Sequence, residues 1–226
     1  MAVHGRTAMM RIFVTAVLVI SGADGTAAPR LSLVRAPTRL AAQPAAPGHT
    51  REGAPAGPTM DLVGVIRSGG RPQADAVVWL DAPDAPPSAP RRAVLDQRNL
   101  TFEPHVLVVR VGTTVELPNN DRVFHNVFSF HDGKRFDLGL YPAGTSKRLV
   151  FDRPGLSRVF CNIHPGMAAY ILAVDTPYFA VSDANGRFSI RAVPRGAYTY
   201  HAWRPGGRTI TGSVAGDEAP FEVSLP

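Results

Sequence analysis

Hydrophobic and polar positions alternate along most of the chain beyond residue 58, with the period of two that is typical of β-strands. Turn signals such as Ser68-Gly69-Gly70 and Asn185-Gly186 interrupt these runs. The pattern predicts twelve strands: Asp61–Arg67, Ala76–Leu80, Ala93–Gln97, Val106–Val111, Thr113–Leu117, Asn126–Phe130, Lys147–Phe151, Leu156–Cys161, Ala168–Val174, Phe179–Ser182, Arg187–Arg191 and Ala197–Trp203. No convincing amphipathic helix accompanies them, so we expect an all-β fold, either a sandwich or a barrel.

The first 58 residues follow a different pattern. Arg6 and Arg11 precede the apolar run Ile12–Ile20, and small residues follow as far as Ala28. Because this run is shorter than the roughly 20 apolar residues that cross a membrane, residues 1–28 are typical of a signal peptide removed on export. An uncleaved N-terminal anchor is the alternative. Residues 29–58 are rich in Ala, Pro and Gly and are expected to form a disordered linker.

Composition sharpens this picture in three respects. Gly and Pro together make up about one residue in five of the 226, against an average of roughly 12%, which favours many short strands and turns. The net charge of +6 comes without a run of Lys or Arg, which makes nucleic acid an unexpected partner. A single cysteine excludes an intrachain disulfide framework, a zinc finger and a four-cysteine cluster.

The cysteine lies in a segment that is rich in metal-ligating residues. Cys161, His164 and Met167 follow one another at three-residue intervals on a predicted turn between two apolar strands, and His125 lies at the start of an earlier strand. One thiolate, two imidazoles and a thioether form the ligand set of a blue-copper site, in which the thioether is a weak axial ligand. A bound metal would also explain the lone thiol, which is otherwise a liability in an oxidising compartment.

Each of these residues has a plainer interpretation when it is taken alone. Cys161 would be a small buried hydrophobic residue, Met167 would fill the core, and either histidine would be a polar residue with ordinary hydrogen bonds. The joint spacing Cys-x-x-His-x-x-Met, with His-Asn on a preceding strand, argues against coincidence. The sequence therefore predicts a copper centre.

Residues 93–175 resemble the cupredoxin family, which includes plastocyanin, amicyanin and pseudoazurin. The likeness lies in four segments: Asn99–Pro104, Val109–Val115, Asn119–Val127 and Cys161–Met167. The short spacing of the last segment is most similar to that of amicyanin. The resemblance implies a Greek-key β-sandwich over residues 91–175 that holds one type 1 copper ion.

The resemblance also implies roles for individual residues. The copper ligands would be His125, Cys161, His164 and Met167. Asn126 would not bind copper itself but would hold the ligands in place, because its counterpart in the family ties the two ligand segments together. Phe160 stands where the family often has tyrosine, which puts in doubt any electron route through a tyrosine hydroxyl at this position.

Two segments on either side of this region resemble a second kind of domain. Val63–Leu80 and Tyr178–Tyr198 are similar to strands of the carboxypeptidase regulatory-like, or prealbumin-like, sandwich. We therefore expect residues 59–90 and 176–226 to form one discontinuous sandwich, with the cupredoxin domain inserted in one of its loops. The alternative makes residues 59–90 extra cupredoxin strands and residues 176–226 a separate cap.

The leading functional hypothesis is a periplasmic or secreted one-electron carrier in which copper alternates between Cu(I) and Cu(II). The resemblance makes His164 the exit for the electron, and it would form a small apolar docking patch with Pro165, Gly166 and Ala168. The positive chain favours an acidic redox partner such as a c-type cytochrome, and the resemblance adds a periplasmic dehydrogenase as an electron donor.

Three other functions are weaker alternatives. A non-redox copper-binding or delivery protein would use the same ligands, but delivery favours exposed Met/His tracts, which the sequence lacks. A structural or carbohydrate-adhesive β module would leave an intact ligand set unexplained. An enzyme is least favoured, because four protein ligands leave no open copper position for a substrate. We therefore expect no enzymatic activity, and no membrane span in the mature chain.

Overall fold

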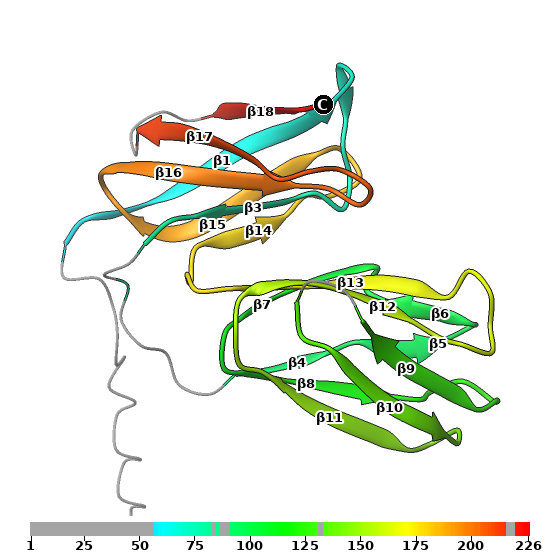
Figure 1. The fold of residues 1–226 in the computed structure, drawn as a ribbon. Helices are drawn as coiled ribbons and strands as arrows, with labels where there is room; N and C mark the ends of the chain where they lie inside the picture. Colours follow the sequence, from blue (N-terminus) through cyan, green and yellow to red (C-terminus); the bar gives the residue numbers. More distant parts are fainter. Residues whose placement is uncertain (1–56, 83–84, 86–90, 131–132, 216–219) are drawn as a thin grey trace, which may run out of the picture. The chain divides into compact units, whose positions relative to one another are not determined.

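The computed structural model describes residues 57–82, 85, 91–130, 133–215 and 220–226. Strands and turns account for these residues and none of them is helical, which confirms the predicted all-β class (Figure 1). Accordingly, the described part of the chain has no helix with the length and apolar character needed to span a membrane. The predicted signal peptide, residues 1–28, and nearly all of the predicted linker, residues 29–58, lie outside the described residues.

Strands from the two ends of the described chain share two sheets. They are β1 (Thr59–Ser68), β2 (Arg71–Pro72), β3 (Val77–Leu80), β14 (Phe179–Val181), β15 (Arg187–Pro194), β16 (Ala197–Trp203), β17 (Ile210–Ala215) and β18 (Phe221–Leu225). One sheet has the order β15-β1-β18, with β2 paired to β1, and the other has the order β14-β3-β16-β17. We call these the flanking sheets.

The middle of the chain forms the central sheets. Their strands are β4 (Arg92–Val94), β5 (Asp96–Arg98), β6 (Thr101–Glu103), β7 (Val106–Arg110), β8 (Thr113–Pro118), β9 (His125–Ser129), β10 (Phe136–Tyr141), β11 (Ser146–Phe151), β12 (Gly155–Phe160) and β13 (Ala168–Val174). A five-stranded sheet has the order β10-β9-β12-β13-β7, a three-stranded sheet has the order β11-β8-β4, and β5 and β6 form a hairpin.

The core of the central sheets follows from the alternation of residues along the strands. In β8, the side chains of Val115 and Leu117 are fully buried, while Thr114 before them and Glu116 between them are partly exposed. These buried residues pack with residues of the five-stranded sheet in one cluster, which includes Val127, Val159, Cys161, Met167 and Ile171. Two sheets therefore enclose one apolar core, as in a β-sandwich, and the candidate sulfur ligands belong to it.

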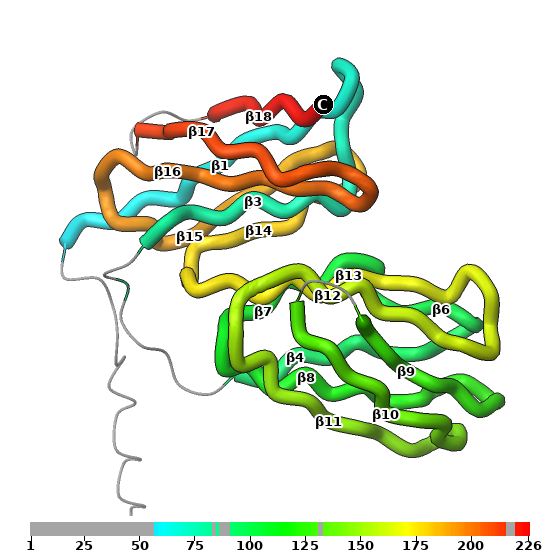
Figure 2. Tube along the Cα trace, viewed as in Figure 1, coloured from blue at the N-terminus to red at the C-terminus, as the bar shows by residue number. Residues whose placement is uncertain are grey.

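The course of the chain explains how the central sheets are connected to the flanking ones. Figure 2 traces it from β1 and β3, in cyan to teal, through the green and yellow central strands, and back to the orange and red strands β15–β18. The flanking sheets have their own core, in which Leu62 and Ile66 of β1 pack with Ile190 and Val223. Strands that precede the central sheets in the chain thus share sheets and a core with strands that follow them, as in a discontinuous domain. The proposed domain boundaries and the prealbumin-like assignment stay predictions.

Several strand predictions need correction. Ala93–Gln97 was expected to be one strand, whereas β4 pairs with β8 and β5 pairs with β6 in a different sheet. The break falls at Leu95, whose side chain is fully buried and whose N–H donates to the carbonyl oxygen of Glu116 at 2.9 Å. The strands β2, β6, β10, β17 and β18 were not predicted at all.

Candidate metal centre

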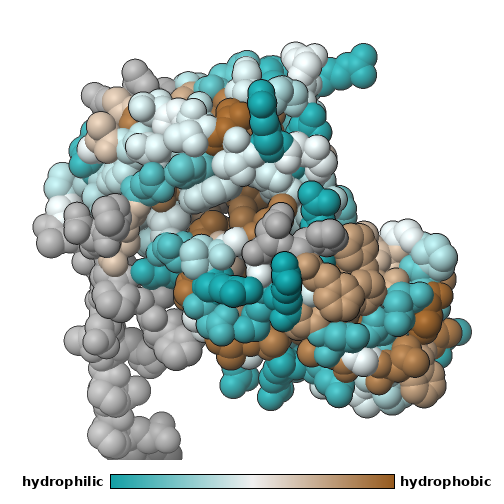
Figure 3. Space-filling view, viewed as in Figure 1, coloured by the Kyte–Doolittle hydropathy of each residue, from teal (hydrophilic) through white to brown (hydrophobic). Residues whose placement is uncertain are grey.

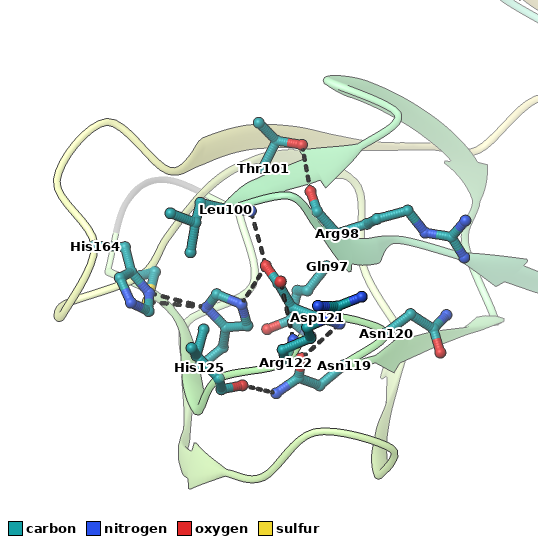
Figure 4. A network of polar contacts seen from close by, with 12 residues as sticks. Gln97, Arg98, Leu100, Thr101, Asn119, Asn120, Asp121, Arg122, His125 and His164 are labelled. Carbon is teal, nitrogen blue, oxygen red and sulfur yellow. Dashed lines mark hydrogen bonds and ion pairs between the residues drawn. The ribbon is translucent and has the colours of Figure 1, made fainter.

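Three metal-ligating side chains meet in the central sheets (Figure 4). His125 is the first residue of β9, Cys161 directly follows β12, and His164 lies in the loop between β12 and β13. Nδ1 of His125 lies 3.0 Å from Nδ1 of His164. Sγ of Cys161 lies 3.6 Å from Nδ1 of His164 and 3.9 Å from Nδ1 of His125. Two segments far apart in the sequence thus supply one cluster, whose ligand atoms all lie within 4.8 Å of one another.

These distances suit a single metal ion. Metal bonds of about 2.1 Å to imidazole nitrogen and about 2.3 Å to thiolate, arranged in a trigonal plane, place two nitrogens about 3.6 Å apart and nitrogen and sulfur about 3.8 Å apart. The sulfur–nitrogen distances of 3.6 and 3.9 Å are close to this geometry, and the nitrogen–nitrogen distance of 3.0 Å is shorter. The three residues can therefore hold a metal, and a thiolate with two imidazoles is a donor set that suits copper.

The loop before β9 is organised by the buried side chain of Asn119. Its Oδ1 accepts the N–H of Asp121 at 3.1 Å, and its Nδ2 donates to the carbonyl oxygens of Val123 at 2.8 Å and Tyr141 at 3.2 Å. Asn is well suited to such turns, because its short amide can replace backbone partners. This arrangement sets the place at which β9 begins and fixes His125, whose side chain is fully buried, against the core.

The loop after β12 carries the other ligands. It closes through two backbone hydrogen bonds, from the N–H of Cys161 to the carbonyl oxygen of Met167 and from the N–H of Met167 to that of His164, both at 3.2 Å. Gly166 has a φ of 86°, a left-handed conformation that glycine adopts without a steric cost. The Pro-Gly pair between the histidine and the methionine therefore allows the tight return into β13.

Met167 directly precedes β13, and Asn126 is the second residue of β9. Their proposed roles stay predictions. Met167 is 2% exposed and belongs to the same buried cluster as Cys161, so its side chain lies in the core. Asn126 is also buried, and its Nδ2 donates to Oδ1 of Asp137 on β10 at 2.8 Å. Its own Oδ1 is buried without a hydrogen-bond partner among the described residues.

The residues of the predicted docking patch are accessible to different degrees. Pro165 and Gly166 are exposed, while His164 and Ala168 are half-buried. Exposed apolar side chains also occur on the loops before β9 and after β12 and on the turn between β5 and β6. They are Leu100 of that turn, Val123 and Phe124 before β9, and Ile163 after β12, with exposed fractions of 50, 42, 56 and 44%. Figure 3 shows brown and tan residues among the teal ones at the end of the central sheets where these loops lie.

Sequence reasoning missed one residue of the site. Asp121 lies four residues before His125, and its Oδ2 is 3.1 Å from Nε2 of that histidine. The only signal for it in the sequence is a carboxylate close to a candidate ligand, which is too common to be informative. The contact depends on how the loop 119–124 folds back on itself.

Comparisons with known proteins give a partial picture. No protein-family model and no curated protein matches the chain. Among similar solved structures, a purple cupredoxin from Nitrosopumilus maritimus is 26% identical, with a TM-score of 0.33, over 37% of this chain and 99% of its own. A copper-containing nitrite reductase (NirK) from Thermus scotoductus SA-01 is 26% identical, with a TM-score of 0.37, over 43% of this chain and 25% of its own. A reduced mutant of amicyanin is 23% identical, with a TM-score of 0.35, over 38% of this chain and 86% of its own. Solved structures similar to this chain thus include cupredoxins.

Proposed function

We propose that this chain is an exported type 1 copper protein that carries one electron at a time between redox partners. The observation that carries the proposal is the convergence of Nδ1 of His125, Nδ1 of His164 and Sγ of Cys161 within 4.8 Å. Met167 would be the weak axial ligand, because its side chain is buried in the same core cluster as Cys161. Copper bound by these residues would supply the one-electron couple between Cu(I) and Cu(II).

The protein's part in this function is to hold the donors in one geometry. His125 is fully buried and Cys161 is 8% exposed, so the core limits the access of water to both. Their positions are set by backbone pairing, since β9 and β12 are neighbours in the five-stranded sheet. Donors that do not move between the two oxidation states keep the reorganisation on electron transfer small. The half-buried His164 would be the route to the surface.

The proposed docking surface combines the predicted patch with the neighbouring loops. His164, Pro165, Gly166 and Ala168 would lie within a larger apolar rim supplied by Leu100, Val123, Phe124 and Ile163. A small apolar contact suits a transient redox encounter, in which release must be fast. The net charge of +6 favours an acidic partner, such as a c-type cytochrome, and we propose the periplasm or the extracellular space as its location.

We propose a carrier rather than an enzyme, because the thiolate, two imidazoles and the thioether together would use four coordination positions. The alternative, a protein that binds or delivers copper without redox exchange, would use the same ligands. The two functions differ in the geometry that the ligands impose on Cu(II) and in the speed of electron exchange, and both are measurable.

An absorbance spectrum of the purified chain with Cu(II) tests the proposal. We expect an intense visible band that disappears on reduction, because a thiolate bound to Cu(II) in this geometry gives a strong charge-transfer transition. The variants Cys161→Ala and His125→Ala should lack the band, while the control His201→Ala, a histidine of β16 in the flanking sheets, should keep it. A colourless copper complex of the wild type would favour delivery. A slow or irreversible voltammetric wave from a coloured protein would argue against electron transfer.

A further inference from the structure

Both ring nitrogens of His125 face a defined partner. Nε2 lies 3.1 Å from Oδ2 of Asp121, and Nδ1 faces Nδ1 of His164 at 3.0 Å and Sγ of Cys161 at 3.9 Å. The His125 side chain is fully buried, so water does not compete for either nitrogen. The position of the imidazole proton is therefore decided by these protein groups.

The carboxylate of Asp121 determines which ring nitrogen of His125 carries the proton. An ionised carboxylate can only accept hydrogen bonds, so Nε2 must donate to it. A neutral imidazole that is protonated on Nε2 has its lone pair on Nδ1. This lone pair points at His164 and Cys161, which is the orientation that a metal ligand needs. With His125 neutral, Nδ1 of His164 is then the donor of the contact between the two rings, because one of the two nitrogens has to carry a hydrogen.

Asp121 is itself held by the backbone. Its Oδ2 also accepts the N–H of Leu100 at 2.8 Å, and its Oδ1 accepts the N–H of Arg122 at 2.9 Å. The hydrogen bond from Leu100 is the main reason that the pKa of the Asp121 carboxyl lies below its usual range. The side chain is 15% exposed. Figure 4 shows the carboxylate between Leu100 and His125, with His164 on the other side of the imidazole.

We propose that Asp121 is a positioning residue that keeps His125 protonated on Nε2 and presents Nδ1 to the metal before the metal arrives. A negative charge hydrogen-bonded to the back of a ligand also makes the imidazole a stronger donor, which stabilises Cu(II) more than Cu(I). Asp121 thereby lowers the reduction potential of the centre. The effect on the potential rests on the proposed function, whereas the effect on the proton of His125 does not.

A merely structural role for Asp121 gives different expectations. If Asp121 only closed the turn through the N–H groups of Leu100 and Arg122, an amide oxygen in its place would serve nearly as well. Asp121→Asn keeps such an oxygen and removes the charge. Its amide can either accept from Nε2 or donate to it, so it no longer selects one tautomer of His125.

Proton–nitrogen correlation spectra of the metal-free, nitrogen-labelled protein at neutral pH provide the first test. We expect His125 of the wild type to carry its proton on Nε2 and the Asp121→Asn variant to show a mixture of both tautomers. With copper, we expect the variant to bind Cu(II) about tenfold more weakly, with less change for Cu(I). If Cu(I) binding does not change, this tenfold loss for Cu(II) raises the potential by about 59 mV, measured by voltammetry, and any loss for Cu(I) makes the rise smaller.

Asp96→Asn is the matched control. It removes the same charge from the hairpin strand β5, where the carboxylate contacts Asn120 at 2.9 Å and Arg98 at 3.3 Å and does not touch His125. We expect it to leave the tautomer unchanged and to shift the potential much less. If the reduction potential shifted equally in Asp121→Asn and Asp96→Asn, the shift would come from long-range charge alone, and the proposal would be overturned.

The proton–nitrogen correlation spectrum of the wild type tests the proposed tautomer of His125 even if Asp121→Asn does not fold. A proton on Nδ1 of His125 in the metal-free wild type would overturn the proposal. So would a folded Asp121→Asn variant with an unchanged tautomer and potential. If the wild type shows the expected tautomer but forms a colourless copper complex, the carrier function fails and the positioning role of Asp121 stands.

Discussion

Tyr141 and Gln97 form a buried polar pair beside His125. Tyr141 is 2% exposed and Gln97 is fully buried, and the backbone of Tyr141 pairs with that of His125 across β10 and β9. The phenol donates to the carbonyl oxygen of Leu117 at 3.1 Å and accepts a hydrogen bond from Nε2 of Gln97. Burial is the main reason that the pKa of Tyr141 rises to about 12, against the usual value of 10.0. The neutral phenol is therefore part of the folded state.

This shift makes the stability of the folded protein sensitive to alkali at Tyr141. Because the pKa of Tyr141 is higher in the folded than in the unfolded chain, its contribution is fully present below pH 10 and is lost as the pH rises toward 12. The loss approaches about 3 kcal/mol of unfolding free energy. We expect Tyr141→Phe to be about 1 kcal/mol less stable than the wild type at neutral pH, and to lack this alkaline loss. Urea unfolding across the alkaline range would measure both.

The control for this prediction is Tyr200→Phe, a half-buried tyrosine of β16. We expect this variant to keep the alkaline loss of the wild type, since Tyr141 is intact. An alkaline loss in Tyr141→Phe as large as that of the wild type would show that another group is responsible.

At the scale of elements, the hairpin of β5 and β6 has an unfavourable turn. Asn99 and Leu100 have φ values of 53° and 57°, the left-handed conformation that two-residue hairpin turns require. Asn tolerates this conformation and glycine favours the second position, whereas leucine is strained there by about 1–2 kcal/mol. Leu100 is also 50% exposed, so packing does not explain its side chain. The exposure of this leucine, whose N–H donates to Asp121, is consistent with the docking surface proposed above.

Leu100→Gly separates stability from function. The variant should be more stable by about 1 kcal/mol, because glycine adopts the left-handed conformation without the clash. Its N–H remains available to Asp121, so we expect the absorbance of the copper-loaded protein to be unchanged. Electron exchange with an acidic c-type cytochrome should be slower, because the apolar rim loses one side chain. Stopped-flow kinetics would measure this rate, and a rate equal to that of the wild type would remove Leu100 from the docking surface.

The elements also show what could be read from the sequence and what could not. The closeness of Cys161 and His164 was predictable because the two residues are three positions apart in one loop, while their role as ligands, and that of Met167, stays a prediction. Strand β10 was missed because five of its six residues are exposed or half-buried at an edge, so buried and exposed positions do not alternate regularly. Strand β17 was missed because Gly212 suggests a loop. In the structure this glycine makes room for the ring of Tyr200, whose Cε1 would lie 2.6 Å from an added Cβ.

The role of Asp121 was beyond sequence reasoning for a different reason. Its contact with His125 depends on a loop that Asn119 shapes through three hydrogen bonds, one of them to the backbone of Tyr141 on another strand. Such a network arises only when the sheets pack. The local pattern thus indicates which candidate side chains are close in sequence, whereas the contact between Asp121 and His125 arises only from tertiary structure.

At the scale of the whole molecule, charge is expected to guide the encounter with a partner. The chain carries 24 Lys and Arg against 18 Asp and Glu. Two acidic side chains already have partners: Asp96 in the β5–β6 hairpin is paired with Arg98 at 3.3 Å, and Asp121 contacts His125 at 3.1 Å. The exposed Arg122 between Asp121 and the apolar rim therefore presents a positive charge at the proposed docking surface.

The rate of electron exchange with an acidic cytochrome should therefore fall with added salt, since the Debye length shortens to about 10 Å at 0.1 M. We expect Arg122→Glu to slow the reaction at low salt on the order of tenfold, and to flatten its dependence on ionic strength. Arg92→Glu changes the net charge equally, but β4 pairs Arg92 with Thr114 at the start of β8, at the opposite end of that strand from the loop 119–124. It should have a smaller effect in stopped-flow measurements. Equal effects of the two variants would mean that net charge alone, and not this surface, attracts the partner.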